Sequence, residues 1–225
     1  MTLGGVDSLP EKKLVSMVRD KFFFSGMQPK SDQVLYTQVD FLEGGNLGYW
    51  QVKRSLKPDQ ENVLFIPATN RRNEREALLS RAINSLYVLS EEFDITLIGM
   101  SDYPGFKSIN TEYFHRLNLH FLTPNHIDYS REEVYNFLQA YRKRFLTEPN
   151  QYSFRGYDIA LFFIQAFQKY GRNFVEQPEL YNDHTLQSVF DFRKTGEFSG
   201  LMNHTLYLVH YTPEYDVHVV SRMSE

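Results

Sequence analysis

Apolar positions recur at helical spacing in the stretch after residue 130, and this is the clearest pattern in the chain. Ser130 and Glu133 have the spacing of a capping box, in which a hydroxyl and a carboxylate bind amide donors of the first helical turn. The pattern predicts an amphipathic helix over 131–146. Its single apolar face consists of Val134, Phe137, Leu138, Tyr141 and Phe145.

A second helix is predicted over 158–169, after Glu148, Pro149 and Asn150 interrupt the first pattern. This segment is apolar on every side, and a helix of that kind is covered nearly all round in folded proteins. Burying each of its large side chains contributes about 1.5–3 kcal/mol. We therefore expect the hairpin either to form a homodimer through residues 131–170 or to fold back onto its own sheet.

Short apolar runs alternate with helical patterns before this hairpin. The runs predict strands near 33–39, 62–66, 95–98 and 119–122, separated by helical segments near 8–26, 44–56 and 73–92. This alternation predicts an α/β fold whose mainly parallel sheet has helices on both faces. Two further strands are expected at 205–211 and 217–221. We expect an α/β lobe formed by 1–125 with 187–225, and a helical segment, 126–186, belonging to another lobe.

Composition limits the classes of function. The 225 residues are 42% apolar, enough for a core, and the formal net charge of -4 comes without a basic patch that would attract nucleic acid. Cysteine is absent, which excludes disulfides and thiolate chemistry. No apolar run reaches the ~20 residues of a membrane span, and the first residues lack the pattern of a signal peptide. The seven histidines show no metal-binding spacing, so we expect no metal and no cofactor.

Candidate binding residues lie in the loops that follow two predicted strands, where ligands sit in open parallel sheets. In the loop after 62–66, Thr69, Asn70 and Arg71 stand at a helix start, where backbone amides and a guanidinium can hold a carboxylate. An alternative is that Asn73 only caps that helix and the arginines are solvated. The loop after 95–98 contributes Ser101, Asp102 and Tyr103, the last either for a ligand or for packing.

Two catalytic motifs are only approximated. The segment DFLEGGNLG at 40–48 is glycine-rich but lacks the GxGxxG spacing of dinucleotide-binding sites. The segment GMSDY at 99–103 has Tyr103 where a nucleophile elbow requires a small residue. Both observations favour a protein that is not an enzyme. The NHT glycosylation pattern at 203–205 is attributed to chance.

The order of features in the hairpin also resembles that of a known protein family. An amphipathic helix ending in a basic-aromatic turn precedes a short loop with proline, then Gly156-Tyr157-Asp158 and a very apolar helix that closes on Tyr170-Gly171. From about residue 12 to residue 220 the chain resembles the carboxyl-terminal part of type I periplasmic binding proteins, the solute receptors of ABC transporters. It is most similar to the amino-acid-type, LysM-associated branch found in Bacteroidetes.

The resemblance implies a non-catalytic, extracytoplasmic domain of the periplasm or cell envelope that binds a small polar ligand such as an amino acid. It implies an ABC transporter permease or another envelope protein as partner, and Asp102 as the acidic residue that pairs with the ligand's ammonium group. It also implies lobe closure about hinges at 122–126 and near 190–192. In that family an upstream array supplies further ligand contacts, so the chain is expected to be a truncated receptor.

Two other functions stay open. One is a structural or protein-interaction module of the cell envelope that keeps the fold and has lost the ligand. The other is a Rossmann-like enzyme that uses the loop at 44–48.

Overall fold

The chain forms two compact units that are each discontinuous in sequence. The computed structural model describes residues 2–3, 38–39, 46–67, 73–176, 180–182, 185–194, 196 and 199–224. Unit 1 comprises Met1–Phe121 with Val209–His218, and unit 2 comprises Leu122–Leu208 with Val219–Glu225. The chain therefore passes three times from one unit to the other. The segment 187–208, expected with the α/β lobe, lies in unit 2, and so do the residues 190–192 expected as a hinge.

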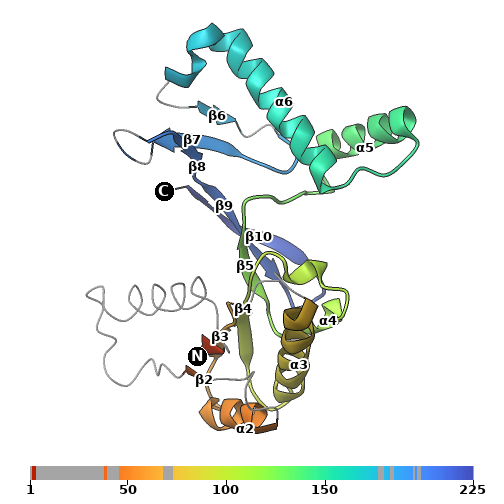
Figure 1. Ribbon diagram of the computed structural model, residues 1–225. Coiled ribbons are helices and arrows are strands. Elements are labelled where there is room, and N and C mark those ends of the chain that lie inside the picture. Colours follow the sequence, from red (N-terminus) through yellow and green to blue (C-terminus); the bar gives the residue numbers. More distant parts are fainter. Residues whose placement is uncertain are drawn as a thin grey trace. The chain divides into compact units, whose positions relative to one another are not determined.

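A mainly parallel sheet organises unit 1, as Figure 1 shows. Its order is β10-β9-β5-β4-β3-β1-β2, and all the pairings determined among β1 to β5 are parallel. The four strands expected from apolar runs are therefore confirmed as mutually parallel, although 33–37 of the first lie outside the described residues. The strands are β1 (Thr2–Leu3), β2 (Gln38–Val39), β3 (Asn62–Phe65), β4 (Ile95–Ile98), β5 (His120–Thr123), β9 (Thr205–Tyr211) and β10 (Val217–Ser224). The last two residues of β5, the first four of β9 and the last six of β10 belong to unit 2.

β1 was not predicted, and it changes the topology of the sheet. It lies between β2 and β3, which gives the order 2-1-3-4-5 for the parallel strands. In a doubly wound sheet of this order the direction of winding reverses between strands 1 and 3. The topological switch point therefore lies between β1 and β3. The mixed α/β class, the mainly parallel sheet and the antiparallel pair β9–β10 are as expected.

Helices follow the strands of unit 1 in alternation. They are α2 (Asn46–Ser55), α3 (Asn73–Leu89), the 3-10 helix η1 (Tyr103–Gly105) and α4 (Thr111–Arg116). The long helix α3 contacts both α2 and α4. Its buried residues Leu79, Ile83 and Leu86 share one face and are at most 2% exposed. Since Leu64 and Leu97 of neighbouring strands are also fully buried, the core of unit 1 includes these strands and helix.

Unit 2 contains the helical hairpin and a small sheet (Figure 1). Its elements are α5 (Glu132–Phe145), α6 (Gln151–Tyr170), the 3-10 helix η2 (Gly171–Glu176), β6 (Leu180–Asn182), β7 (Phe190–Lys194) and β8 (Leu201–Asn203). β6, β7 and β8 form an antiparallel sheet in that order. Phe162 of α6 packs on Phe190, Phe192 and Leu201, so one face of α6 covers this sheet. The hairpin thus packs on strands of its own chain.

Both helix starts differ from the sequence prediction. The predicted capping box at Ser130 is wrong, because Ser130 N and Oγ both donate to Asp128 Oδ1 and α5 begins one residue later than expected, with Arg131 as its N-cap. α6 begins seven residues earlier than expected. There Asn150 accepts from the amides of Tyr152 and Ser153, and Ser153 Oγ accepts from Asn150 N.

Candidate functional site

The loops after β3 and β4 leave the sheet of unit 1 side by side. Phe65 is paired with Ile98, and Ile66 N donates to Ile98 O at 3.1 Å. Gly99 N in turn donates to His120 O at 2.9 Å, which continues the ladder to β5. Because β3 also borders the switch point, the carboxyl end of β3 lies where doubly wound sheets place their ligands.

The predicted ligand residues divide between these two loops. Ser101 is exposed and Asp102 half-buried, and both lie in the turn between β4 and η1. Thr69, Asn70 and Arg71 lie outside the described residues, so their position relative to Asp102 stays a prediction. The turn leads into a 3-10 helix, whereas a nucleophile elbow requires a strand followed by an α-helix. Ser101 therefore does not stand in the geometry of a hydrolase nucleophile.

Tyr103 is a core residue of unit 1. Its side chain has no exposed surface, and its ring lies 5.9 Å from the ring of Phe106 and 6.5 Å from that of Phe114. Its hydroxyl donates to Ile66 O at 2.5 Å. Of the two roles considered for Tyr103, this geometry fits packing and does not fit contact with a ligand. The same bond ties the loop after β4 to the end of β3.

The Tyr103 ring lies so close to the backbone of residue 99 that only glycine fits there. A Cβ atom at this position would lie 2.6 Å from Tyr103 Cε2 and 2.9 Å from Leu119 Cδ1, closer than carbon atoms tolerate. Glycine at 99 thus allows the Tyr103 ring to lie against the end of β4. The positions of Asp102 and Ser101 depend on this packing.

Two histidines of unit 1 stack on neighbouring strands. The rings of His120 in β5 and His210 in β9 lie 4.0 Å apart and 13° from parallel. His120 Nδ1 donates to Asn118 O at 2.8 Å, and His210 Nε2 contacts Asn118 Oδ1. Burial lowers the pKa of His210, and the nearby His120 and His218 lower it further, against an opposing effect of Glu214. The lowered pKa favours the neutral form of His210.

Asp158 is the residue of unit 2 whose role the sequence did not reveal. Its carboxylate is fully buried and accepts from the amides of Leu186, Gln187 and Ser188 at 2.7, 2.9 and 2.9 Å. Burial raises the pKa of Asp158, and the three amide donors act in the opposite direction. The carboxylate holds the buried segment 185–191 against α6. Its place in a helix resembles that of an ordinary acidic residue, so only the three-dimensional structure could show this contact.

Other polar groups surround the same segment. Arg131 Nη1 donates to Thr185 O at 2.9 Å, and Ser188 Oγ donates to Asn125 Oδ1 at 3.0 Å. Burial raises the pKa of Tyr207 to about 12; Arg131 lowers it and Asp158 raises it further. Thr185 Oγ1 is buried without a hydrogen-bond partner. These contacts stabilise the segment, and we assign the cluster a structural role.

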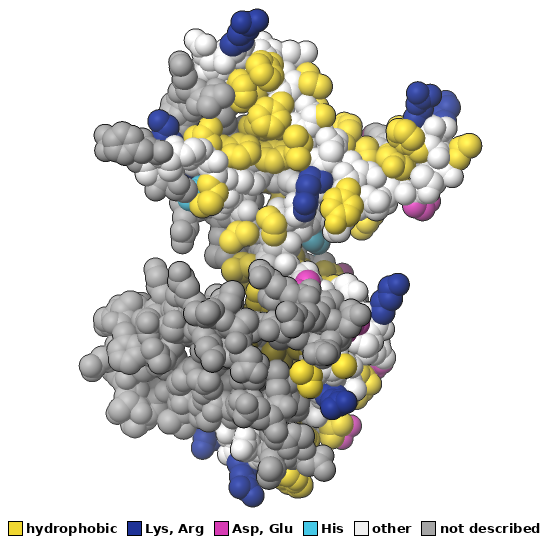
Figure 2. All heavy atoms as spheres, in the orientation of Figure 1, with side chains coloured by type: hydrophobic (Ala, Val, Ile, Leu, Met, Phe, Trp, Pro, Cys, Tyr) yellow, Lys and Arg dark blue, Asp and Glu magenta, His cyan; other side chains and the backbone are white. Residues whose placement is uncertain are grey.

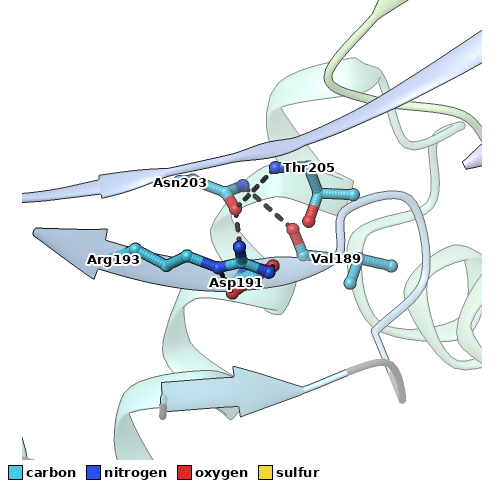
Figure 3. Close-up of polar contacts among 5 residues, drawn as sticks. All are labelled: Val189, Asp191, Arg193, Asn203 and Thr205. Atoms are coloured by element: carbon cyan, nitrogen blue, oxygen red, sulfur yellow. Dashed lines mark hydrogen bonds and ion pairs between the residues drawn. The ribbon is translucent and has the colours of Figure 1, made fainter. Parts of the chain in front are cut away.

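The side chain of Asn203 connects β7, β8 and β9 where they meet, as Figure 3 shows. Asn203 Oδ1 accepts from Asp191 N at 2.9 Å and Thr205 N at 3.3 Å, and its Nδ2 donates to Val189 O at 2.9 Å. Asp191 is nearly buried and forms two bonds with Arg193, at 3.0 and 2.6 Å. Because the Asn203 amide is engaged with the backbone, the NHT pattern at this position serves the fold.

The described part of the chain contains neither a metal-binding cluster nor a membrane-spanning helix. No group of three or more His, Asp or Glu there has an arrangement that could hold a metal ion. None of the helices described combines the length and hydropathy needed to span a bilayer.

No protein-family model matches the chain, and no curated protein sequence matches it.

Proposed function

We propose that the chain is a non-catalytic, extracytoplasmic solute-binding domain for a small zwitterion such as an amino acid, similar to a type I solute receptor of an ABC transporter. The observation that carries the proposal is the strand order 2-1-3-4-5 of unit 1. This order defines a switch point next to β3, and ligands of doubly wound sheets bind beyond the carboxyl ends of the strands at such points.

The residue types in the two loops suit the two charges of an amino acid. Backbone amides at the start of α3, together with Thr69 and Arg71, would hold the carboxylate. Asp102, in the loop after β4, would pair with the ammonium group. Tyr103 would not contact the ligand. It would position Asp102, because its bond to Ile66 O keeps the Asp102 loop against the end of β3.

Isothermal calorimetry on the full chain with a mixture of amino acids tests the proposal. Asp102→Ala should weaken binding by about 1.5–3 kcal/mol, because the ammonium loses a charged hydrogen-bond partner. The matched control is Asp94→Ala, since Asp94 is exposed and precedes β4, at the other end of the same strand. An absence of heat with every amino acid, or equal losses in the two variants, would contradict a zwitterion site at this edge.

The alternative of a cell-envelope interaction module is favoured by a separate observation in unit 2. Large apolar side chains and cations share the exposed surface of α5 and α6. That surface can act whether or not unit 1 binds a solute.

A further inference from the structure

α6 has two apolar faces. One is buried within unit 2, and the other is partly exposed, although Tyr157 contacts Phe137, and Phe163 and Phe167 contact Phe174. Phe154, Asp158, Phe162 and Ala166 follow at four-residue spacing and are buried. The opposite arc consists of Tyr157, Ala160, Phe163, Ile164 and Phe167, and the four large side chains among them are 38–56% exposed.

No charged residue interrupts the outer arc of α6. The charged residues of this helix are Arg155, Asp158 and Lys169, and at 100° per residue all three fall on the side of the buried face. An uncharged, exposed apolar strip of this kind is typical of a surface that binds a partner molecule or a membrane. Figure 2 shows hydrophobic side chains gathered over α6, with Lys and Arg side chains toward the ends of α5 and α6.

The end of α5 adds protruding apolar side chains beside a basic cluster. Arg142, Lys143 and Arg144 form the last turn, and Phe145 and Leu146 follow with 58% and 90% of their surfaces exposed. Leu146 has the left-handed conformation of a C-cap, with φ 55°, so the chain reverses direction at this point. The most exposed large hydrophobic residue of the described chain thus stands next to three cations.

Charge distinguishes the candidate partners of this surface. Residues 142–172 contain six Lys or Arg and two acidic residues, a net charge of +4 in a chain whose net charge is -4. Of the two acids, Asp158 is buried, and Glu148 is paired with Arg142 at 2.8 Å. Arg155 and Lys169 lie on the side of the buried face, so the cations next to exposed apolar residues are those of the last turn of α5. An anionic partner complements that end of the hairpin.

A second copy of the chain fits this surface poorly. The apolar strip of α6 is roughly 400 Å² per copy, about half of what a standard interface buries on each side. This small area argues against self-association through α6.

We propose that the outer surface of α5 and α6 binds an anionic lipid bilayer. Protruding Phe145 and Leu146 would enter the interfacial region, while Lys143 and Arg144 meet lipid phosphates. Tyr135 and Tyr152, exposed at 58% and 66%, are of the type that collects at the membrane–water boundary. A fluid bilayer accepts exposed side chains of this kind without a matching pocket, whereas protein partners bind their central side chains in pockets.

Vesicle co-sedimentation with the full chain tests the proposal. Vesicles of phosphatidylcholine mixed with phosphatidylglycerol should bind the chain, vesicles of phosphatidylcholine alone should not, and added salt should weaken binding. The double variant K143E/R144E should reduce binding about 30-fold or more, because each cation at an anionic surface contributes about fivefold. F145S/L146S should reduce it at least tenfold, since the inserted apolar area is lost.

The charge control is R54E/K57E, which makes the same change of net charge on exposed residues of unit 1. It should bind vesicles like the wild type, and circular dichroism should show that all variants are folded. Equal binding to both kinds of vesicle, or an equal loss in the control, would overturn the proposal. So would competition by soluble polyglutamate as strong as that by lipid, which indicates an acidic protein, or a dimer in light scattering that Phe163→Glu converts to monomer.

Discussion

Asp158→Ala should destabilise unit 2 more than any surface substitution, because three buried amides depend on this one carboxylate. The amides of residues 186–188 donate to it at 2.7–2.9 Å, and all three residues are buried. Alanine cannot accept a hydrogen bond, and water reaches a buried segment only if the segment opens. The substitution therefore leaves three donors unsatisfied.

The expected loss follows from the cost of a buried unsatisfied donor, about 1–3 kcal/mol each. Relaxation of the segment and the removal of a buried charge offset part of the sum, so we expect about 3–5 kcal/mol for Asp158→Ala. Asp158→Asn keeps the volume and one acceptor oxygen but turns an NH₂ group toward a donor, and should lose about 2–3 kcal/mol.

Urea unfolding must be followed by a probe of unit 2. The single tryptophan, Trp50, lies in α2 of unit 1, so its fluorescence reports on the other unit. Far-ultraviolet circular dichroism measures the loss of helices in both units, so the part of its transition that tryptophan fluorescence does not follow reports on α5 and α6. Hydrogen exchange measures the amides of 186–188 directly.

The matched control is Thr185→Val in the same buried segment. Thr185 Oγ1 has no hydrogen-bond partner, so the isosteric valine should leave stability within about 1 kcal/mol of the wild type or raise it. If Asp158→Ala loses less than about 1 kcal/mol and the three amides keep their protection, the carboxylate does not hold this segment.

Two further predictions concern unit 1 and are read from tryptophan fluorescence in urea. Gly99→Ala should lose about 1–3 kcal/mol because its Cβ would meet the Tyr103 ring, whereas Gly105→Ala, where a Cβ meets nothing within 4 Å, should be neutral; equal effects would refute the packing argument. The lowered pKa of His210 means that the unfolded chain binds more protons, so stability should fall as the pH drops through about 6.5 and below. His210→Phe should keep the stacking on His120 and flatten this dependence, and an unchanged slope would assign it to other groups.

The strands of unit 1 were predictable because each is a compact apolar run between polar segments. Runs such as 62–66 and 95–98 can be buried only in a sheet with covered faces, and alternation with helices requires parallel pairing. β1 was not predictable in this way, because Thr2–Leu3 forms no run and is recognised only by its pairing with β2 and β3.

The errors at the hairpin have local physical causes. Asp128 accepts from the amide and hydroxyl of Ser130, which leaves that hydroxyl bound to Asp128 and not to the first turn of α5. α6 opens with polar residues after Asn150, so hydrophobic spacing placed its start too late. At the candidate site, the sequence could not predict the role of an aromatic residue. An aromatic residue after a strand has the same sequence signal whether it contacts ligand or core, and only the burial of Tyr103 distinguishes the two.

The interleaving of the two units has a consequence for the order in which the protein can fold during synthesis. His115 Nδ1 bonds to Thr212 O across 97 residues of sequence, and Tyr211 packs against Phe114 and donates its amide to Leu119 O. While the ribosome produces unit 2, the edge of β5 in the nascent unit 1 therefore lacks its neighbour and exposes unpaired backbone groups. Unit 1 is completed only after residues 209–218 have emerged, and the nascent protein is most exposed to aggregation before that point.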